Sequence, residues 1–293
     1  DDGGLFVEKA FVINVTNVNE PPADISLSSP AVMENQPAGT EVGTLDTVDP
    51  DSGDTFTYTL VAGEGADDNA AFLITGQSLQ TAASFDHETQ PSRSVRVRSE
   101  DQGALAVEKI FVITVADTNE APHAPSNVSP DDAAVDRPTT VTLQTSAFSD
   151  VDNADSHLAS QWLVRKAADN SLVFDTGEDT GNKTTLVLPD GVLDYGTTYD
   201  WQARHSDAAG LWSDYSIPTT FSTVAPALTV SVSESRFIIA WPTNTDGFTL
   251  QYTTNFHSTD WQPVLPLPEI VDGFNVVTNA LDGDAVYYRL QKP

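Results

Sequence analysis

The sequence contains no cysteine among its 293 residues. Disulfide bonds, zinc–thiolate centres and thiol nucleophiles are therefore excluded. Exported β-sandwich domains often depend on disulfides for stability. A domain of that kind without cysteine needs another brace, and a bound cation is one candidate.

Basic residues are also scarce, with 13 Lys and Arg against 43 Asp and Glu, so the formal net charge is −30. Such a charge repels the phosphates of nucleic acid and the headgroups of anionic lipid, so we expect neither as a partner. It attracts divalent cations. The alternative is that the charge only keeps the protein soluble in saline water.

Long apolar runs are missing as well. None approaches the ~18 residues needed to cross a bilayer, so we expect no membrane-spanning segment. The chain starts at Asp1 without a charged and apolar leader. We therefore expect it to be part of a longer precursor whose signal peptide lay upstream.

What the chain does contain is an internal repeat. Residues 1–22 and 101–122 are identical at 13 of 22 positions when they are aligned at an offset of 100. A period of this length is the size of one immunoglobulin-like sandwich. We expect residues 1–20 to be the end of a truncated repeat and residues 21–120 to be a complete copy.

Alternation of apolar and polar residues predicts β-strands throughout the chain. Phe56, Tyr58 and Leu60 alternate with threonines, and Val95 and Val97 alternate with arginines. No stretch shows sustained helical periodicity. The sequence therefore predicts an all-β fold of tandem immunoglobulin-like sandwiches.

Two further modules follow the repeat. Residues 121–224, the middle module, lack the 100-residue pattern but show the same alternation of apolar and polar residues. Residues 225–293, the final module, have strand patterns of their own, including Leu228, Val230 and Val232. The final module is short for an independent core, so we expect it to dock on its neighbour.

The acidic residues are clustered in turns. Asp49, Asp51 and Asp54 lie within six residues, and residues 150–155 repeat that spacing with Asp150, Asp152 and Asp155. Calcium prefers six to eight oxygen ligands, and carboxylates two residues apart in a turn can converge on one ion. An EF-hand fits neither cluster, because the twelfth position is not glutamate in either.

Residues 19–120 resemble a cadherin repeat of the bacterial type. The matching motifs are Met33-Glu34-Asn35, Asp49-Pro50-Asp51, Phe85-Asp86-His87-Glu88, Ser99-Glu100-Asp101-Gln102-Gly103 and Asp117-Thr118-Asn119-Glu120-Ala121-Pro122. In that family, calcium ions lie between successive repeats. The resemblance implies an extracellular or cell-surface protein in which calcium stiffens the junctions between modules.

Carried over residue by residue, the resemblance implies two calcium clusters. The upper cluster consists of Asn17, Asn19, Glu20, Asp49, Asp51 and Asp101. The lower cluster consists of Glu34, Asp86, Glu88, Asp117, Asn119 and Glu120, and we expect Asp150 and Asp152 of the next module to close it. Asn17 stands where the family usually has Asp, so we expect weaker binding in the upper cluster.

The middle module resembles a fibronectin type III-like module of bacterial surface proteins. The likeness lies in Gln161-Trp162 and in residues 193–204 and 210–216. It implies that Trp162 is the core indole and that Tyr199 makes a corner hydrogen bond. It also implies that Trp212 stacks on Arg204 or Arg165.

The final module resembles the C-terminal β domain of exported proteins from Verrucomicrobia-like bacteria. The matching residues are Ile239-Ala240-Trp241-Pro242, residues 247–255, Trp261 and Tyr287-Tyr288-Arg289-Leu290. The resemblance leaves open a role in secretion or in surface attachment.

Motifs of the common enzyme classes are missing. There is no Gly-x-Ser-x-Gly elbow, P-loop or dinucleotide fingerprint, and no His-x-x-x-His pair. Acid pairs for glycoside hydrolysis are not excluded by sequence, but the densest acids lie at module junctions, where a metal accounts for them without a substrate cleft. We therefore expect no active site in this chain.

Three functions have to be distinguished. The first is a calcium-stiffened adhesion or stalk region, whose partner is a second copy, another cell-surface protein or a glycan. The second is an accessory carbohydrate-binding segment of a secreted polysaccharide-degrading enzyme, with Trp201, Trp212 and Trp261 as its aromatic platform. The third is an acid-coated spacer that binds no metal and does not respond to a chelator.

Overall fold

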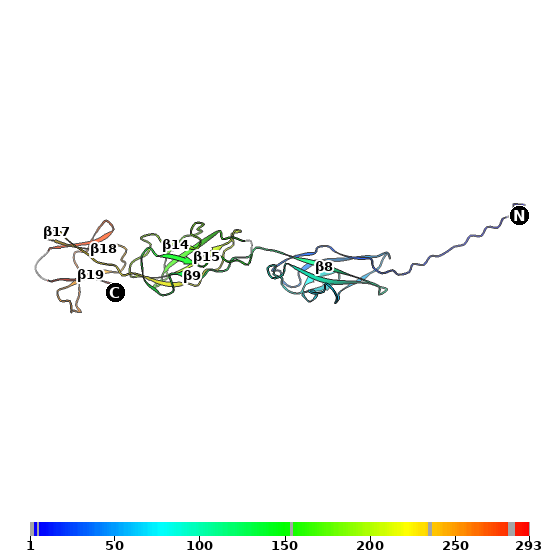
Figure 1. Cartoon of the computed structure of the whole chain (residues 1–293), viewed down its shortest axis with the longest axis horizontal. Helices are drawn as coiled ribbons and strands as arrows, with labels where there is room; N and C mark the ends of the chain where they lie inside the picture. Colours follow the sequence, from blue (N-terminus) through cyan, green and yellow to red (C-terminus); the bar gives the residue numbers. More distant parts are fainter. Residues whose placement is uncertain (1–2, 5, 153–154, 234–235, 281–284, 293) are drawn as a thin grey trace. The chain divides into compact units, whose positions relative to one another are not determined.

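The computed structural model describes residues 3–4, 6–152, 155–233, 236–280 and 285–292. The chain divides into an N-terminal unit, Asp1–Asn119, and a C-terminal unit, Glu120–Pro293 (Figure 1). The described residues form strands and turns with a single 3-10 turn, η1 (Asn69–Ala71), and no α-helix. The predicted all-β fold class is confirmed. No helix in the described part of the chain is long and apolar enough to cross a membrane.

Two four-stranded sheets make up the N-terminal unit. The first has the strand order β1 (Asp24–Leu27), β3 (Glu41–Val48), β6 (Ser78–Thr81) and β5 (Phe72–Thr75). The second has the order β2 (Ala31–Met33), β8 (Ala106–Ala116), β7 (Ser92–Asp101) and β4 (Phe56–Leu60). β8 runs parallel to β2 and antiparallel to β7, so it is held on both sides.

The alternation predicted from the sequence produces the core of this unit. Val95 and Val97 of β7 and Ile113 and Val115 of β8 are fully buried, because alternate side chains of a strand point to the same face of the sheet. Tyr58 of β4 packs in the same cluster. The predicted strands at Phe56–Leu60 and around Val95 are therefore confirmed.

The segment before the first sheet differs from its repeat copy in secondary structure and in burial. Residues 6–20 form no strand, and Phe11, Ile13 and Val15 are 75%, 83% and 92% exposed. Their repeat counterparts lie in β8, where Ile113 and Val115 are fully buried in the core of the unit and Phe111 packs partly buried against it. The same pattern is thus buried in one copy and exposed in the other, because burial depends on partner strands that a local pattern does not specify.

The C-terminal unit contains the middle module's two sheets. One has the order β10 (Ala134–Arg137), β16 (Thr219–Thr223), β15 (Thr198–Ser206), β12 (Ala159–Lys166) and β13 (Leu172–Asp175). The other has the order β14 (Thr185–Val187), β11 (Thr142–Thr145) and β9 (Asn127–Ser129).

The implied roles of two aromatic residues are confirmed in this module. Trp162 is fully buried, and its indole N–H donates to the carbonyl of Asn182 at 2.8 Å. The hydroxyl of Tyr199 accepts the backbone N–H of Asp194 at 2.8 Å, which is the expected corner hydrogen bond. Both contacts anchor the ends of the core around β12 and β15.

The final module has two smaller sheets. Their strand orders are β17 (Thr229–Ser233), β18 (Arg236–Pro242), β22 (Phe274–Ala280), β21 (Glu269–Val271), and β20 (Gln262–Pro263), β19 (Thr249–Thr253), β23 (Tyr287–Gln291). Its core cluster centres on Ile239, Trp241 and Leu250. Val230 and Val232 lie in a strand as predicted, but both are 65% exposed, so no other element covers this face of β17 among the described residues. The domain boundaries proposed from the sequence stay predictions.

Candidate metal sites

The centre of the lower cluster is Glu34, which directly follows β2 and is only 1% exposed. One carboxylate oxygen, Oε1, accepts the backbone N–H of Thr118 at 2.7 Å. The other, Oε2, accepts the backbone N–H of His87 at 2.7 Å. Glu34 therefore fixes the segment after β8 and the loop around residue 87 at the same place.

Three further acids of the lower cluster lie around this point. Glu34, Asp86 and Glu88 form one group, and His87, Glu88 and Asp117 form another; within each group the potential ligand atoms lie within 4.8 Å of one another. Burial raises the pKa of Glu88, and the negative charges of Glu34 and Asp117 raise it further. A cation at this place would offset that repulsion.

Asp86 has a second role that the sequence does not indicate. Its two oxygens accept hydrogen bonds from the backbone N–H and the hydroxyl of Thr89, both at 2.9 Å. These bonds lower the pKa of Asp86. Asp86 thus caps a turn as well as lying among the predicted ligands.

The remaining members predicted for the lower cluster lie at the end of one unit and the start of the next. Asn119 is exposed at the end of the N-terminal unit, and Glu120 starts the C-terminal unit. The closure of the lower cluster by Asp150 and Asp152 involves residues of both units and stays a prediction.

In the upper cluster, Asp101 is 5% exposed at the end of β7. Oδ1 accepts the backbone N–H groups of Gly103 and Leu105 at 2.8 and 2.9 Å, and Oδ2 accepts the side-chain amide of Asn19 at 2.9 Å. Burial acts to raise the pKa of Asp101, but these hydrogen bonds outweigh it, so the pKa lies below its usual value. Asp101 is therefore a charged carboxylate held in a fixed orientation.

Asp51 connects the rest of the upper cluster. Its Oδ2 accepts the backbone N–H of Glu20 at 2.7 Å, and its Oδ1 accepts the side-chain amide of Asn17. Its own N–H donates to Oδ1 of Asp49 at 2.8 Å. The structure thus brings together the side chains of Asn17, Asn19, Asp49, Asp51 and Asp101, whereas Glu20 contributes its backbone N–H. These residues come from segments distant in sequence.

Asp54 belongs to this group, although the family resemblance did not include it. Asp49, Asp54 and Asp101 place potential ligand atoms within 4.8 Å of one another. Burial raises the pKa of Asp54, and the charges of Asp49, Asp51 and Asp101 raise it further. The dense acidic turn at 49–54 was the available signal for it.

A third set of carboxylates, which we call the head cluster, lies in the C-terminal unit and consists of Asp150, Asp152, Asp155 and Asp207. Asp150, Asp155 and Asp207 bring potential ligand atoms within 4.8 Å of one another. The N–H of Asp152 donates to Oδ1 of Asp150 at 3.2 Å. Asp207 is fully buried and was missed from the sequence.

The head cluster repeats the hydrogen bonds of the upper cluster. In the upper cluster, the N–H of Asp101 donates to the carbonyl of Leu105, and the N–H of Leu105 donates to Oδ1 of Asp101. Asp207 and Leu211 make the same pair of bonds, with the N–H of Leu211 2.8 Å from Oδ1 of Asp207. In the upper cluster the N–H of Glu20 donates to Asp51. In the head cluster the N–H of Glu120 donates to Oδ2 of Asp152 at 2.9 Å. The middle module therefore has the same local acid arrangement without the repeat's sequence pattern.

The signal for Asp207 was present but short. Asp101-Gln102-Gly103-Ala104-Leu105 in the repeat corresponds to Asp207-Ala208-Ala209-Gly210-Leu211 in the middle module. Asp101 is the last residue of β7 and Asp207 directly follows β15, and in both cases a leucine four residues later closes the turn. Only the aspartate and the leucine occupy matching positions, and two identities are too few to be found by a repeat search.

Several carboxylate oxygens in these clusters are buried without a hydrogen-bond donor among the described residues. They are Oδ2 of Asp49, Asp54, Asp150 and Asp155 and Oδ1 of Asp152. Buried polar atoms without a partner are rare in folded proteins, and for anionic oxygens a cation is the natural partner. The residues present therefore fit an oxygen-coordinated ion.

A histidine pair lies close to the head cluster in sequence. The rings of His157 and His205 are 4.2 Å apart between centroids, and both stack with Phe148. His205 is fully buried, and its Nε2 lies 3.1 Å from the hydroxyl of Thr145. Burial, followed by the neighbouring His157, lowers the pKa of His205 to about 4.

Acid is therefore expected to destabilise the C-terminal unit through His205. The folded state keeps this ring neutral down to about pH 4, whereas the unfolded chain protonates it near pH 6.5. The free energy of unfolding is therefore highest above the pKa of His205 in the unfolded chain. It falls by at most about 3 kcal/mol as the pH is lowered from about 6.5 towards 4. Urea denaturation of metal-stripped protein in calcium-free buffers across this range measures the loss.

His205→Gln removes the titrating ring, so its unfolding free energy should fall less steeply over that range than that of the wild type. The exposed His257 offers a matched control, because His257→Gln should leave the wild-type slope unchanged. Parallel pH profiles for wild type and His205→Gln would show that this histidine does not control acid stability.

The aromatic platform considered for carbohydrate binding is not formed by the three tryptophans. Trp201 is fully buried and stacks with Trp162 at 6.0 Å between centroids, so it presents no ring to a ligand. The guanidinium of Arg204 lies over Trp212 at 4.6 Å, as implied from the sequence, and that of Arg289 lies over Trp261 at 4.4 Å. These rings are used for packing and cation–π contacts.

Comparison with known proteins links the chain to cadherins by sequence. No protein-family model matches the chain. Human protocadherin-16 is 32% identical over 135 residues, which cover 44% of this chain and 4% of that protein. Human cadherin EGF LAG seven-pass G-type receptor 2 is 35% identical over 99 residues, covering 32% of this chain and 3% of that protein. The chain thus spans a small part of the length of these relatives.

Among solved structures, human protocadherin-24 EC1-2 matches with a TM-score of 0.41 and 16% identity, covering 67% of this chain and 93% of that chain. The sequence matches are the stronger link, because they exceed 30% identity over about the length of one repeat or more. By these matches, part of the chain is similar in sequence to cadherins over about the length of one repeat.

Proposed function

We propose that the chain is a calcium-binding adhesion or stalk region of a cell-surface or secreted protein. Calcium binds at the lower, upper and head clusters. The observation that carries this proposal is the convergence, in each cluster, of carboxylates from separate segments. In the upper and head clusters, some of their buried oxygens have no hydrogen-bond donor in the part of the chain that the structure describes.

Calcium fits these clusters better than other common metals. Its preferred ligands are carboxylate, amide and backbone oxygens at about 2.3–2.6 Å, and the clusters offer Asp, Glu and Asn side chains. Zinc and copper favour sulfur and imidazole nitrogen. The chain has no cysteine, and His87 already uses its Nδ1 in a contact with the carbonyl of Val115 at 2.7 Å.

The affinity needed is modest in an extracellular setting. At millimolar calcium, a site with a Kd of about 10⁻⁴ M stabilises the folded state by roughly 1–1.5 kcal/mol. Several sites in one unit add to a substantial part of the stability of a domain, which is typically about 5–15 kcal/mol. Calcium thus replaces the disulfides that the chain lacks.

The proposed role is mechanical. Without a cation, the acids at the end of the N-terminal unit repel one another, and with calcium they are fixed around an ion. Residues 117–120 carry three of the predicted ligands and connect the two units along the chain. Calcium therefore reduces the freedom of this connection, and the adhesion partner is a second copy, another cell-surface protein or a glycan.

We propose the finer family assignments on the same basis. The repeat is of the bacterial cadherin type, the middle module is fibronectin type III-like, and the final module is of the Verrucomicrobia C-terminal type. The corner hydrogen bond of Tyr199 and the Arg204–Trp212 stack support the assignment of the middle module. None of the three modules is proposed to be catalytic.

The function is tested by melting curves of wild type and Glu88→Ala, each with millimolar calcium and with EGTA. Calcium should raise the melting temperature of the wild type, and Glu88→Ala should lose part of that rise, since Glu88 belongs to both groups of the lower cluster. Glu64→Ala removes an exposed glutamate elsewhere in the same unit and should respond to calcium as the wild type does. Identical melting curves with calcium and with EGTA for both proteins would contradict calcium binding and favour the spacer that binds no metal.

A further inference from the structure

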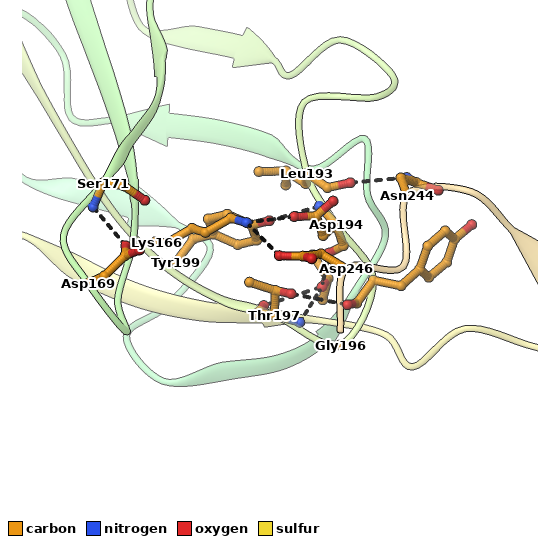
Figure 2. Close-up of polar contacts among 12 residues, drawn as sticks. Lys166, Asp169, Ser171, Leu193, Asp194, Gly196, Thr197, Tyr199, Asn244 and Asp246 are labelled. Carbon is orange, nitrogen blue, oxygen red and sulfur yellow. Dashed lines mark hydrogen bonds and ion pairs between the residues drawn. The ribbon is translucent and has the colours of Figure 1, made fainter. Parts of the chain in front are cut away.

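Among the described residues, the final module contacts a loop of the middle module and the lysine beside it. This docking loop consists of residues 193–197, between β14 and β15. The backbone N–H of Tyr195 donates to the carbonyl of Asn244 at 2.9 Å. The side-chain amide of Asn244 donates back to the carbonyl of Leu193 at 3.1 Å (Figure 2). The two modules thus exchange hydrogen bonds in both directions through a short stretch of backbone.

A lysine from the middle module adds an ionic contact beside the loop. Lys166, the last residue of β12, lies 2.9 Å from a carboxylate oxygen of Asp194 and 3.4 Å from one of Asp246 in the final module (Figure 2). The pKa of Lys166 is raised, first by its hydrogen bond to Asp194 and further by Asp246. Lys166 is therefore a cation shared by an acid from each module.

The far end of the chain returns to the same loop. Lys292 donates to the hydroxyl of Thr197 at 3.1 Å and to the carbonyl of Gly196 at 3.4 Å. Its ammonium also lies 5.4 Å from the centre of the Phe248 ring. That ring covers Gly196, where an added Cβ would lie 2.8 Å from a ring carbon. The loop is thus enclosed by three parts of the final module.

None of these contacts involves a carboxylate cluster, and all are formed by donors and acceptors of the protein itself. The final module has a small core, and its contacts to the docking loop come from residues 244–248 and from the last strand's end. A short module with a small core gains stability when it packs on a neighbour.

We propose that the docking loop and Lys166 form a metal-independent docking surface for the final module, so that the C-terminal unit moves and unfolds as one body. The chain then has two kinds of connection: calcium-dependent clusters, which rest on the proposed function, and a joint made of direct contacts. Force applied at the final module is transmitted to the middle module whether or not calcium is present.

Gly196→Ala tests this surface with a matched control. Gly196 has a φ of +56°, and the new methyl group would collide with Phe248. Gly191 in the same connection has a φ of +80° and nothing within 4 Å of an added Cβ, so Gly191→Ala also places an alanine at a positive φ but without touching the final module. A difference between the two variants therefore reports on docking.

The measurement is the distance between spin labels at Thr180→Cys and Thr278→Cys in the full chain, which has no other cysteine. Both positions are exposed, one in each module. We expect a single narrow distance distribution in wild type and in Gly191→Ala, identical with calcium and with EGTA, and a broad or divided distribution in Gly196→Ala. A broad distribution in wild type, a change with calcium, or identical distributions in both glycine variants would overturn the proposal.

A second variant covers the case in which Gly196→Ala fails to fold. Asp246→Asn removes the charge that faces Lys166, and Asp272→Asn removes an exposed charge elsewhere in the final module. Only Asp246→Asn should broaden the distance distribution. Distributions of the same width in both variants would contradict a role of the ionic contact in docking. The calcium response of wild-type melting tests the proposed function separately, so failure of one idea leaves the other measurable.

Discussion

In EGTA, the free energy of unfolding of the Glu34→Ala variant is expected to be about 2–4 kcal/mol lower than that of the wild type. The reason is that two backbone N–H groups lose a buried, charged acceptor. Those groups belong to His87 and Thr118, which lie 53 and 84 residues further along the chain. The variant should also lose the calcium-dependent stabilisation of the lower cluster, roughly 1–1.5 kcal/mol at millimolar calcium. Chemical denaturation with calcium and with EGTA measures both losses.

Glu34→Gln distinguishes the structural role of this residue from its role as a ligand. Glutamine keeps one carbonyl oxygen as an acceptor but carries no charge, so it should recover part of the stability in EGTA while binding calcium less tightly. If Glu34→Ala unfolds as the wild type does in both buffers, Glu34 neither holds the two segments together nor binds an ion.

The second large effect is expected at Asp101. Asp101→Ala removes the acceptor of three N–H groups, from Gly103, Leu105 and the Asn19 side chain, at a nearly buried position. We expect the free energy of unfolding in EGTA to fall by about 2–4 kcal/mol. Hydrogen bonds to charged groups contribute about 1.5–3 kcal/mol each, and water can hydrogen-bond to some of the freed N–H groups, which limits the loss. The upper cluster should in addition stop responding to calcium.

Asp46→Ala is the matched control for this variant, because Asp46 is an exposed aspartate of β3 in the same unit. Its stability and calcium response should match those of the wild type. Asp207→Ala makes the corresponding change in the head cluster and should destabilise the C-terminal unit instead. An Asp101→Ala protein that keeps the full calcium response would remove the upper cluster from the account.

The fold could be predicted largely because strands leave a local pattern. Val95 and Val97 alternate with arginines and are buried on one face, and Trp162 and Tyr199 lie where the module resemblance implied. The pattern could not predict what covers a strand. Residues 11–15 and Val230 show the same apolar alternation, yet they are exposed, because burial depends on neighbours distant in sequence.

The candidate site could be predicted only in part for the same reason. Glu34, Glu88 and Asp101 were found because they belong to a motif set with a known order. Asp207 was missed because its neighbours differ from those of Asp101, although the turns make the same hydrogen bonds. Three-dimensional convergence, rather than spacing in sequence, brings Asp155 and Asp207 together.

The most direct test of calcium binding is a crystal structure of the chain grown in millimolar calcium, with ions located by anomalous scattering. The account predicts an ion within about 2.3–2.6 Å of carboxylate oxygens in the lower cluster, at Glu34 and Glu88, and in the upper cluster, at Asp51 and Asp101. Maps that show only water among these side chains at that concentration would contradict it.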